Sequence, residues 1–153
     1  MRAKATKSLA AFTLLEMMVS VIVLSVLISF SVPRFRKAFE QARVDLATAN
    51  LQAIWTAQRL YKVQNGAFAQ NISPELDDYL DPAFVANLNN AKASFLYYIS
   101  TGTYTPTTFD AQAVRNPNLT SFWYGYVDLD QAGMLVGGIR NADGDLVTPV
   151  STF

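Results

Sequence analysis

Residues 11–33 read AFTLLEMMVSVIVLSVLISFSVP, and from position 12 to position 32 the only charged side chain is Glu16. About 20 helical residues cross the hydrocarbon core of a bilayer, so this apolar run predicts a membrane-spanning helix. A short basic leader precedes it, with charges at Arg2, Lys4 and Lys7. Because basic residues beside a span favour the cytoplasmic side, we expect the N-terminus in the cytoplasm.

The position of small residues bears on processing. A secretory signal peptide is cut after its apolar run, following small residues spaced as in A-x-A, and residues 29–34 offer no such site. A small-residue junction lies instead ahead of the run, at Ala11–Phe12. We therefore expect any cleavage to fall there and to leave the span in the product.

The helical pattern continues beyond Pro33 as two apolar stripes on opposite faces of a helix. The first stripe is Phe35, Phe39, Ala42, Leu46, Ala49, Ala53, Ala57 and Leu60. The second is Val44, Ala47, Leu51, Ile54 and Trp55. A helix that is apolar on two sides needs two partners, and a single head domain supplies one. Gly66 predicts its end near Asn65.

Pro33 lacks a backbone donor and is expected to kink or loosen this helix without ending it. The alternative is that Pro33 marks the start of a separate helix just outside the membrane. The apolar stripe that runs on from Phe35 favours one continuous helix.

Residues 66–153 have the short helix, strand and turn signals of a small globular head domain. Ser73-Pro74 and Asp81-Pro82 predict brief helices over 74–80 and 82–90. Aromatic and β-branched runs predict strands at 93–100, 121–129, 134–140 and 145–150, with a long polar loop at 102–117. The predicted fold is α+β, with four parts: a leader at 1–11, a membrane helix at 12–33, its amphipathic continuation at 34–65, and a head with a small antiparallel sheet.

The composition excludes several kinds of chemistry. The chain has no cysteine and no histidine, which removes disulfides, thiol nucleophiles, serine-histidine catalysis and the common zinc sites. With 12 basic and 12 acidic residues the chain has no net positive charge that would attract nucleic acid. A carboxylate pair could still hydrolyse glycosides, but the acids at 75–81 are interpreted as helix caps and a solvated face. We expect no enzyme and no nucleic-acid partner.

Residues 11–33 closely resemble the N-terminus of type IV prepilins and pseudopilins. That family has a leader ending in a small residue, then phenylalanine, a glutamate fifth and a proline twenty-second after the cut; counted from Phe12, Glu16 and Pro33 hold those places. The resemblance implies that prepilin peptidase cleaves Ala11–Phe12 and that Phe12 is N-methylated. The family favours glycine where this chain has Ala11.

The chemistry of Glu16 supports the same interpretation independently, because an ionised carboxylate at the edge of the hydrocarbon costs several kcal/mol unless it is paired. The resemblance implies that it pairs with the amine of Phe12, its own or a neighbour's, and sets the axial register of assembly. The alternative is an interfacial glutamate hydrated by headgroups.

The resemblance further implies a filament subunit that first crosses the inner membrane once. Its expected partners are prepilin peptidase, copies of itself or related pilins, and an inner-membrane assembly platform. The expected filament is an extracellular type IV pilus, with roles such as cell adhesion. The alternatives are a periplasmic pseudopilus of type II secretion, a DNA-uptake system, and a minor tip subunit that binds a ligand.

Two further groups of residues have competing interpretations. Acidic and amide side chains crowd the last two predicted hairpins, at Asp128, Asp130, Asn141, Asp143 and Asp145. Oxygen-rich loops bind calcium, and major pseudopilins bind it near the C-terminus, but Asp-Gly also makes a turn without metal. We interpret these residues chiefly as turns, so that no cofactor is expected and calcium stays open.

The second group is aromatic: Phe95, Tyr97, Tyr98, Tyr104, Phe122, Trp123, Tyr124 and Tyr126. Such a group is a candidate stacking platform for sugars or single-stranded nucleic acid. Period-two alternation instead places about half of it in the sheet core, and no lysine or arginine lies between Ala93 and Val114 to hold phosphates. We favour the core interpretation.

Overall fold

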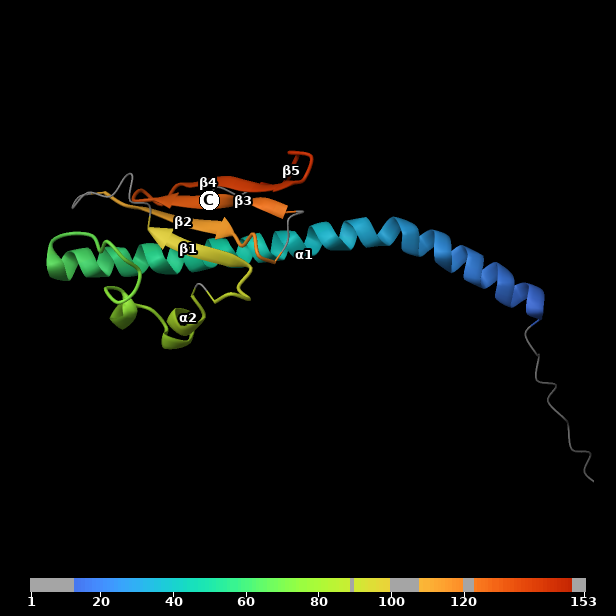
Figure 1. Ribbon diagram of the computed structural model, residues 1–153, viewed down its shortest axis with the longest axis horizontal. Helices are drawn as coiled ribbons and strands as arrows, with labels where there is room; N and C mark the ends of the chain where they lie inside the picture. The colour runs from blue at the N-terminus through green and yellow to red at the C-terminus, as the bar shows by residue number, and fades with distance from the viewer. Residues whose placement is uncertain (1–12, 89, 100–107, 120–122, 150–153) are drawn as a thin grey trace, which may run out of the picture. The chain divides into compact units, whose positions relative to one another are not determined.

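The structure is a computed structural model that describes residues 13–88, 90–99, 108–119 and 123–149 (Figure 1). The chain forms two compact units, residues 1–36 and 37–153. The elements are α1 (Leu14–Asn65), η1 (Asp77–Tyr79), α2 (Pro82–Asn87), β1 (Phe95–Ile99), β2 (Asp110–Arg115), β3 (Trp123–Asp130), β4 (Leu135–Asn141) and β5 (Leu146–Pro149). The predicted α+β class, a long N-terminal helix with a small antiparallel sheet, is confirmed.

Helix α1 begins and ends where local chemistry places its termini. The Thr13 hydroxyl accepts a hydrogen bond from the Glu16 N–H at 3.2 Å, which caps the first turn. Gly66 follows the last residue with φ at 79°, the left-handed conformation that glycine adopts at low cost. The helix runs through Pro33, so the alternative that a separate helix starts there is wrong.

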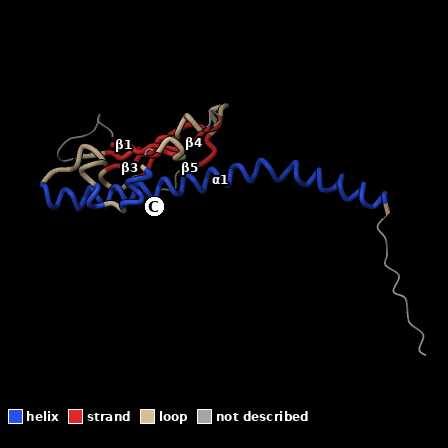
Figure 2. The backbone as a smooth tube through the Cα atoms, turned by 60° about the horizontal axis from the view of Figure 1, so that its bottom comes forward, coloured by secondary structure: helices blue, strands red, loops and turns tan. Residues whose placement is uncertain are grey.

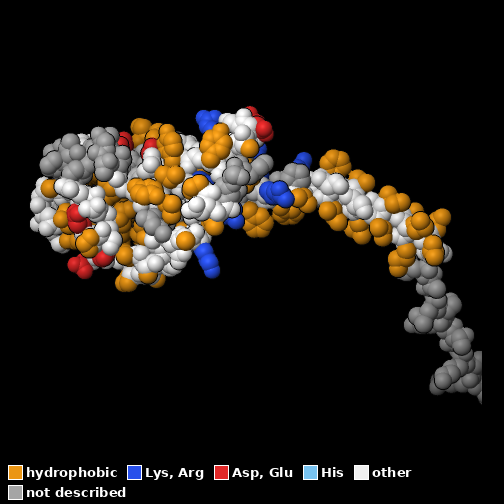
Figure 3. Space-filling model, in the orientation of Figure 1, with side chains coloured by type: hydrophobic (Ala, Val, Ile, Leu, Met, Phe, Trp, Pro, Cys, Tyr) orange, Lys and Arg blue, Asp and Glu red, His pale blue; other side chains and the backbone are white. Residues whose placement is uncertain are grey.

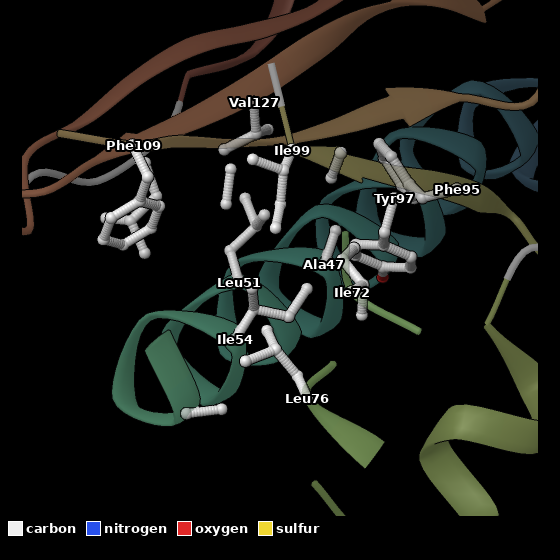
Figure 4. Close-up of a cluster of buried hydrophobic side chains, with 14 of the residues drawn as sticks. Ala47, Leu51, Ile54, Ile72, Leu76, Phe95, Tyr97, Ile99, Phe109 and Val127 are labelled. Carbon is white, nitrogen blue, oxygen red and sulfur yellow. The ribbon is translucent and has the colours of Figure 1, made fainter. Parts of the chain in front are cut away.

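In the second unit, the five strands form an antiparallel meander in the order β1-β2-β3-β4-β5, which covers one face of α1 (Figure 2). The face of α1 toward the sheet carries the second predicted stripe; Val44, Ala47, Leu51 and Ile54 are at most 1% exposed. Figure 4 shows Leu51 pointing toward Ile99 of β1 and Ile54 lying beside Leu76. These side chains build one core between helix, sheet and the 66–80 segment.

Strand β2 is a correction to the sequence prediction. Residues 110–115 were expected within a polar loop, yet they pair with β1 on one side and β3 on the other, so the sheet has five strands rather than three or four. The segment DAQAVR has weak strand propensity, but Ala111 and Ala113 are both fully buried against the core. Tertiary packing outweighed local preference here.

The short helices also differ from prediction. Within the segment 74–80 the helical part is the 3-10 turn η1, which has no side-chain cap, and the Ser73 hydroxyl donates to the Asp77 carboxylate at 3.0 Å. Asp81 does cap α2, accepting from the N–H groups of Ala83 and Phe84 at 2.8 and 3.1 Å. That helix ends at Asn87 rather than at residue 90.

A buried ion pair fixes the helix against the sheet. Arg115 Nε lies 2.6 Å from Glu40 Oε1, with the two side chains 2% and 1% exposed. Arg43 Nη1 approaches the other carboxylate oxygen at 2.9 Å, and Arg115 also donates to the Ser94 carbonyl. The sequence patterns did not predict this pair, although a glutamate on the same face as Val44 and Ala47 was a usable signal.

Candidate assembly surface

The described part of the first unit, residues 13–36, presents apolar side chains in all directions. Large hydrophobic residues there remain exposed, from 80% at Leu14 to 45% at Val32. Figure 3 shows these side chains along the visible face of the helix. By length and composition the helix can cross a membrane, and none of its most apolar stretch is buried within the protein.

The serine hydroxyls of this helix are satisfied inside it. Ser20, Ser25, Ser29 and Ser31 each donate to the carbonyl four residues earlier, at 2.7–2.9 Å. Hydroxyl groups in hydrocarbon are costly when they lack partners. These hydrogen bonds therefore make the polar residues of the run compatible with lipid or with neighbouring helices.

Glu16 lies in the first turn of α1 and its side chain is exposed. The positive end of the helix dipole favours a carboxylate at this position. Among the described residues, the structure shows no ion pair of Glu16. Ala11 and Phe12 lie outside those residues, so the pairing of Glu16 with the Phe12 amine and the cleavage site remain predictions. Pro33 lies within α1, and its predicted role in assembly is likewise untested.

In the second unit, the first predicted stripe forms an uncovered outer face of α1. Phe39, Leu46 and Leu60 are 67%, 62% and 50% exposed. The alanines at 42, 49 and 53 between them are exposed as well. Ala57 was assigned to this stripe but is 1% exposed and belongs to the core. An apolar strip of this length on a protein surface indicates an interaction site.

The calcium candidates fall into two groups at opposite ends of β4, since one hairpin precedes that strand and the other follows it. At the first turn, Asp130 Oδ1 accepts from Met134 N at 2.8 Å. At the second, Asn141 Oδ1 accepts from Asp143 N and Asp145 N at 3.1 and 2.9 Å. The structure therefore does not bring these residues into one site. Within the described ranges, no cluster of three or more acidic side chains has metal-binding geometry.

Asp128 lies on the outer face of the sheet rather than in a turn. Burial raises the pKa of its carboxyl group, the hydrogen bond from Gln112 at 2.8 Å lowers it, and nearby Asp110 raises it. This environment is that of a partly covered sheet residue.

The aromatic residues are divided between the two sheet faces. Phe95 and Tyr97 are buried, and burial raises the pKa of the Tyr97 phenol, which Asn50 approaches at 2.8 Å. Tyr98, Tyr124 and Tyr126 are 45–49% exposed on the opposite face. Tyr104 and Phe122 lie outside the described residues. The core interpretation accounts for the inward half.

Comparison with known proteins agrees with the helix and the motif. Residues 7–32 match the family described as the prokaryotic N-terminal methylation motif. The resemblance of residues 11–33 to the N-terminus of prepilins and pseudopilins is therefore confirmed for this stretch of the chain.

One curated relative shares a longer stretch of similar sequence. The chain is 37% identical over 59 residues to the type II secretion system core protein G of Pseudomonas aeruginosa. The match covers 39% of this chain and 42% of that relative, less than half of either. No solved structure matches the chain.

Proposed function

We propose that this protein is a structural subunit of a type IV pilus or a related filament, inserted in the inner membrane and then assembled through α1. The observation that carries the proposal is a helix whose first half is apolar in all directions, in register with the methylation motif. A filament gives such a helix neighbours of the same kind after it leaves the lipid.

Processing supplies the group that Glu16 needs. Cleavage at Ala11–Phe12 by prepilin peptidase removes the basic leader and creates a new amine, which methylation leaves cationic. In the docked state the carboxylate of Glu16 meets that amine on the same or a neighbouring subunit. Because a buried charge without a partner costs several kcal/mol, this pairing favours one axial register.

The second half of α1 supports the same role. The sheet covers only one of its apolar faces, and the strip from Phe39 to Leu60 stays open. Neighbouring subunits are the covering that a filament provides. The proposal thus accounts for both apolar stripes with one assembly.

A pseudopilus is the second candidate, and the relative named as a type II secretion core protein favours it. The two candidates differ in where filaments accumulate. Shearing cells and identifying the released filament protein separates them, because a surface pilus yields this chain as a dominant component and a periplasmic pseudopilus does not.

The test of the proposed function is Glu16→Gln, with intact-mass spectrometry and electron microscopy on the same cells. We expect both parent and variant to be membrane-inserted, because removing a charge from the apolar run does not hinder its insertion. We expect the mature parent to begin with N-methyl-phenylalanine at Phe12. Filaments should become at least tenfold rarer in the variant at equal subunit levels, since docking then buries the amine without a charge partner.

Replacing Ser20 with alanine is the matched control, since its hydroxyl bonds only within the helix. Equal filament numbers for Glu16→Gln and the parent would show that the carboxylate is merely interfacial. A mature protein that retains Met1 or begins near Arg34 would refute the processing step.

A further inference from the structure

Three basic side chains follow the apolar run of α1 directly. Arg34, Arg36 and Lys37 are all exposed, and we name them the basic collar. Figure 3 shows basic side chains on the visible face of α1 where the dense apolar stretch ends. Residues 17–39 contain these three charges and no acidic side chain. The collar is therefore a strongly positive segment at one end of an apolar helix.

The described part of the chain supplies no counter-charge to the collar. The nearest acid along the helix is Glu40, four residues after Arg36. Its carboxylate is 1% exposed and is already paired with Arg115 and Arg43, at 2.6 and 2.9 Å. Among the described residues, no collar side chain forms an ion pair. A fixed counter-charge for the collar must therefore come from another molecule.

The length of the apolar run places the collar at a membrane surface. Helix α1 begins at Leu14, and the 20 residues from there to Pro33 span about 30 Å at 1.5 Å per residue. The hydrocarbon core of a bilayer has about this thickness. When Glu16 lies near one edge of the hydrocarbon, Arg34 therefore lies at the other edge, at the level of the lipid phosphate groups.

The collar side chains point in several directions around the helix. At about 100° per residue, Arg36 and Lys37 lie about 200° and 300° round from Arg34. Phe35 occupies the remaining sector, and it is 62% exposed. A protein partner on one side would reach only part of this ring of charges, whereas a layer of headgroups surrounds the helix. An apolar ring among cations also suits the boundary between hydrocarbon and headgroups, where long basic side chains extend toward the polar side.

The orientation of the span does not account for the collar. Basic residues beside a span favour the cytoplasmic side, where the leader with Arg2, Lys4 and Lys7 is expected. The collar then lies on the opposite side of the membrane, with the same number of basic side chains as the leader. It opposes the expected orientation instead of supporting it, so an interaction on that side is the better explanation.

We propose that the basic collar binds the phosphate groups of anionic phospholipids in the leaflet opposite the leader. This inference rests on the proposed function only for the insertion of α1 in the inner membrane. A guanidinium group binds phosphate through two parallel hydrogen bonds, and an ammonium group adds a point charge. Basic segments next to a span are attracted to anionic lipid in the same way. Bound lipid would fix the depth of α1, and with it the position of Glu16, until the subunit leaves the membrane.

The test uses the purified full-length chain in phosphatidylcholine vesicles. The probes are phosphatidylglycerol and phosphatidylcholine with a spin label on the acyl chain, and electron paramagnetic resonance measures the fraction of each that the protein immobilises. The collar variant carries Arg34→Gln, Arg36→Gln and Lys37→Gln. The control variant loses three exposed basic residues of the second unit instead, through Arg59→Gln, Lys92→Gln and Arg140→Gln. The leader and the net charge are the same in both variants.

We expect the preference for phosphatidylglycerol to fall at least about threefold in the collar variant and to stay unchanged in the control variant. Arg34→Lys with Arg36→Lys should keep the preference, because it keeps the positive charge. Inorganic phosphate should weaken the preference no more than chloride at the same ionic strength, because a free anion lacks the membrane surface that concentrates the lipid.

Equal lipid preference in the parent and the collar variant would overturn the proposal. Loss of filaments from that variant in cells would then assign the collar to an acidic surface of a neighbouring subunit. Stronger competition by phosphate than by chloride would overturn the choice of lipid as the ligand. Vesicle flotation at alkaline pH measures insertion separately. A parent chain that does not float would refute the membrane stage of the proposed function and the collar site with it, whereas a parent that floats without lipid preference would overturn the collar site alone.

Discussion

Arg115 and Glu40 illustrate how one buried pair fixes the relation of helix and sheet. Both side chains are almost inaccessible, and Arg115 reaches Glu40 of α1, the Ser94 carbonyl and the ring of Phe95 from a single position on β2. Removing charges from water is expensive, so such a pair adds less to stability than its short distance suggests. Breaking it is costly, because one charge then stays buried without its partner.

At this scale we predict that Arg115→Met destabilises the head by about 3–5 kcal/mol. Urea unfolding of a soluble fragment of residues 37–153 measures the change. The double variant Glu40→Leu with Arg115→Met should recover most of the loss, since it leaves no unpaired charge. Arg140→Met is the control, because Arg140 is exposed and, within the described part of the chain, hydrogen-bonds to the Gly144 carbonyl at 2.8 Å. An Arg115 effect no larger than that of the control would contradict the prediction.

Helix α1 has two apolar faces in its second half, one buried and one exposed. Leu51 is fully buried against the sheet, whereas Leu46, five residues earlier, is 62% exposed on the outer face of the helix. Their side chains are chemically identical, so their environments alone distinguish a residue of the core from a residue of the proposed assembly surface. The same comparison cannot be made in residues 14–32, where every large apolar side chain is exposed.

We therefore predict opposite effects for two matched substitutions. Leu51→Asp should unfold the head, because it costs at least the ~2–5 kcal/mol of truncating a buried leucine and also buries a charge. Leu46→Asp should change head stability by less than about 0.5 kcal/mol and yet reduce filament number. Thermal melts of the soluble fragment and electron microscopy of cells provide the two measurements. Normal filaments from the Leu46 variant would show that the outer face of α1 is not used in assembly.

At the scale of the whole molecule, the positions of the acidic residues determine whether they can bind calcium together. The candidates at the two β4 turns are separated by the length of that strand, and the side chains of Asp130 and Asn141 already accept backbone N–H groups. Each turn is therefore complete as a hydrogen-bonded structure. Stabilisation of the head rests on the core between α1 and the sheet, in a chain without disulfides.

We predict that calcium stabilises the head only slightly. A ligand at a hundred times its dissociation constant adds about 2.7 kcal/mol, so a real site gives a clear melting shift. The soluble fragment is melted in calcium and again in chelator, with Asp143→Asn as a second sample. A large shift that this substitution abolishes would contradict the turn interpretation and would favour the pseudopilin candidate.

How much of this protein could be predicted from its sequence depended on whether the signal was local. The apolar run at 12–32, the glutamate and proline in register, the glycine that ends α1 and the turn residues at 130–133 and 141–144 all act through their immediate neighbours. These patterns were enough for the fold class and the long helix. The two stripes on α1 likewise follow from helical periodicity alone.

Only the tertiary structure decided which stripe is buried, because periodicity defines faces but not the partner that covers them. It also decided that DAQAVR is a strand, since the small side chains of Ala111 and Ala113 fit under α1 and the neighbouring strands supply the hydrogen bonds. The pairing of Glu40 with Arg115, 75 residues apart, was likewise decided by the tertiary structure. Such contacts depend on long-range packing, whose free energy exceeds the weak local preference of each segment.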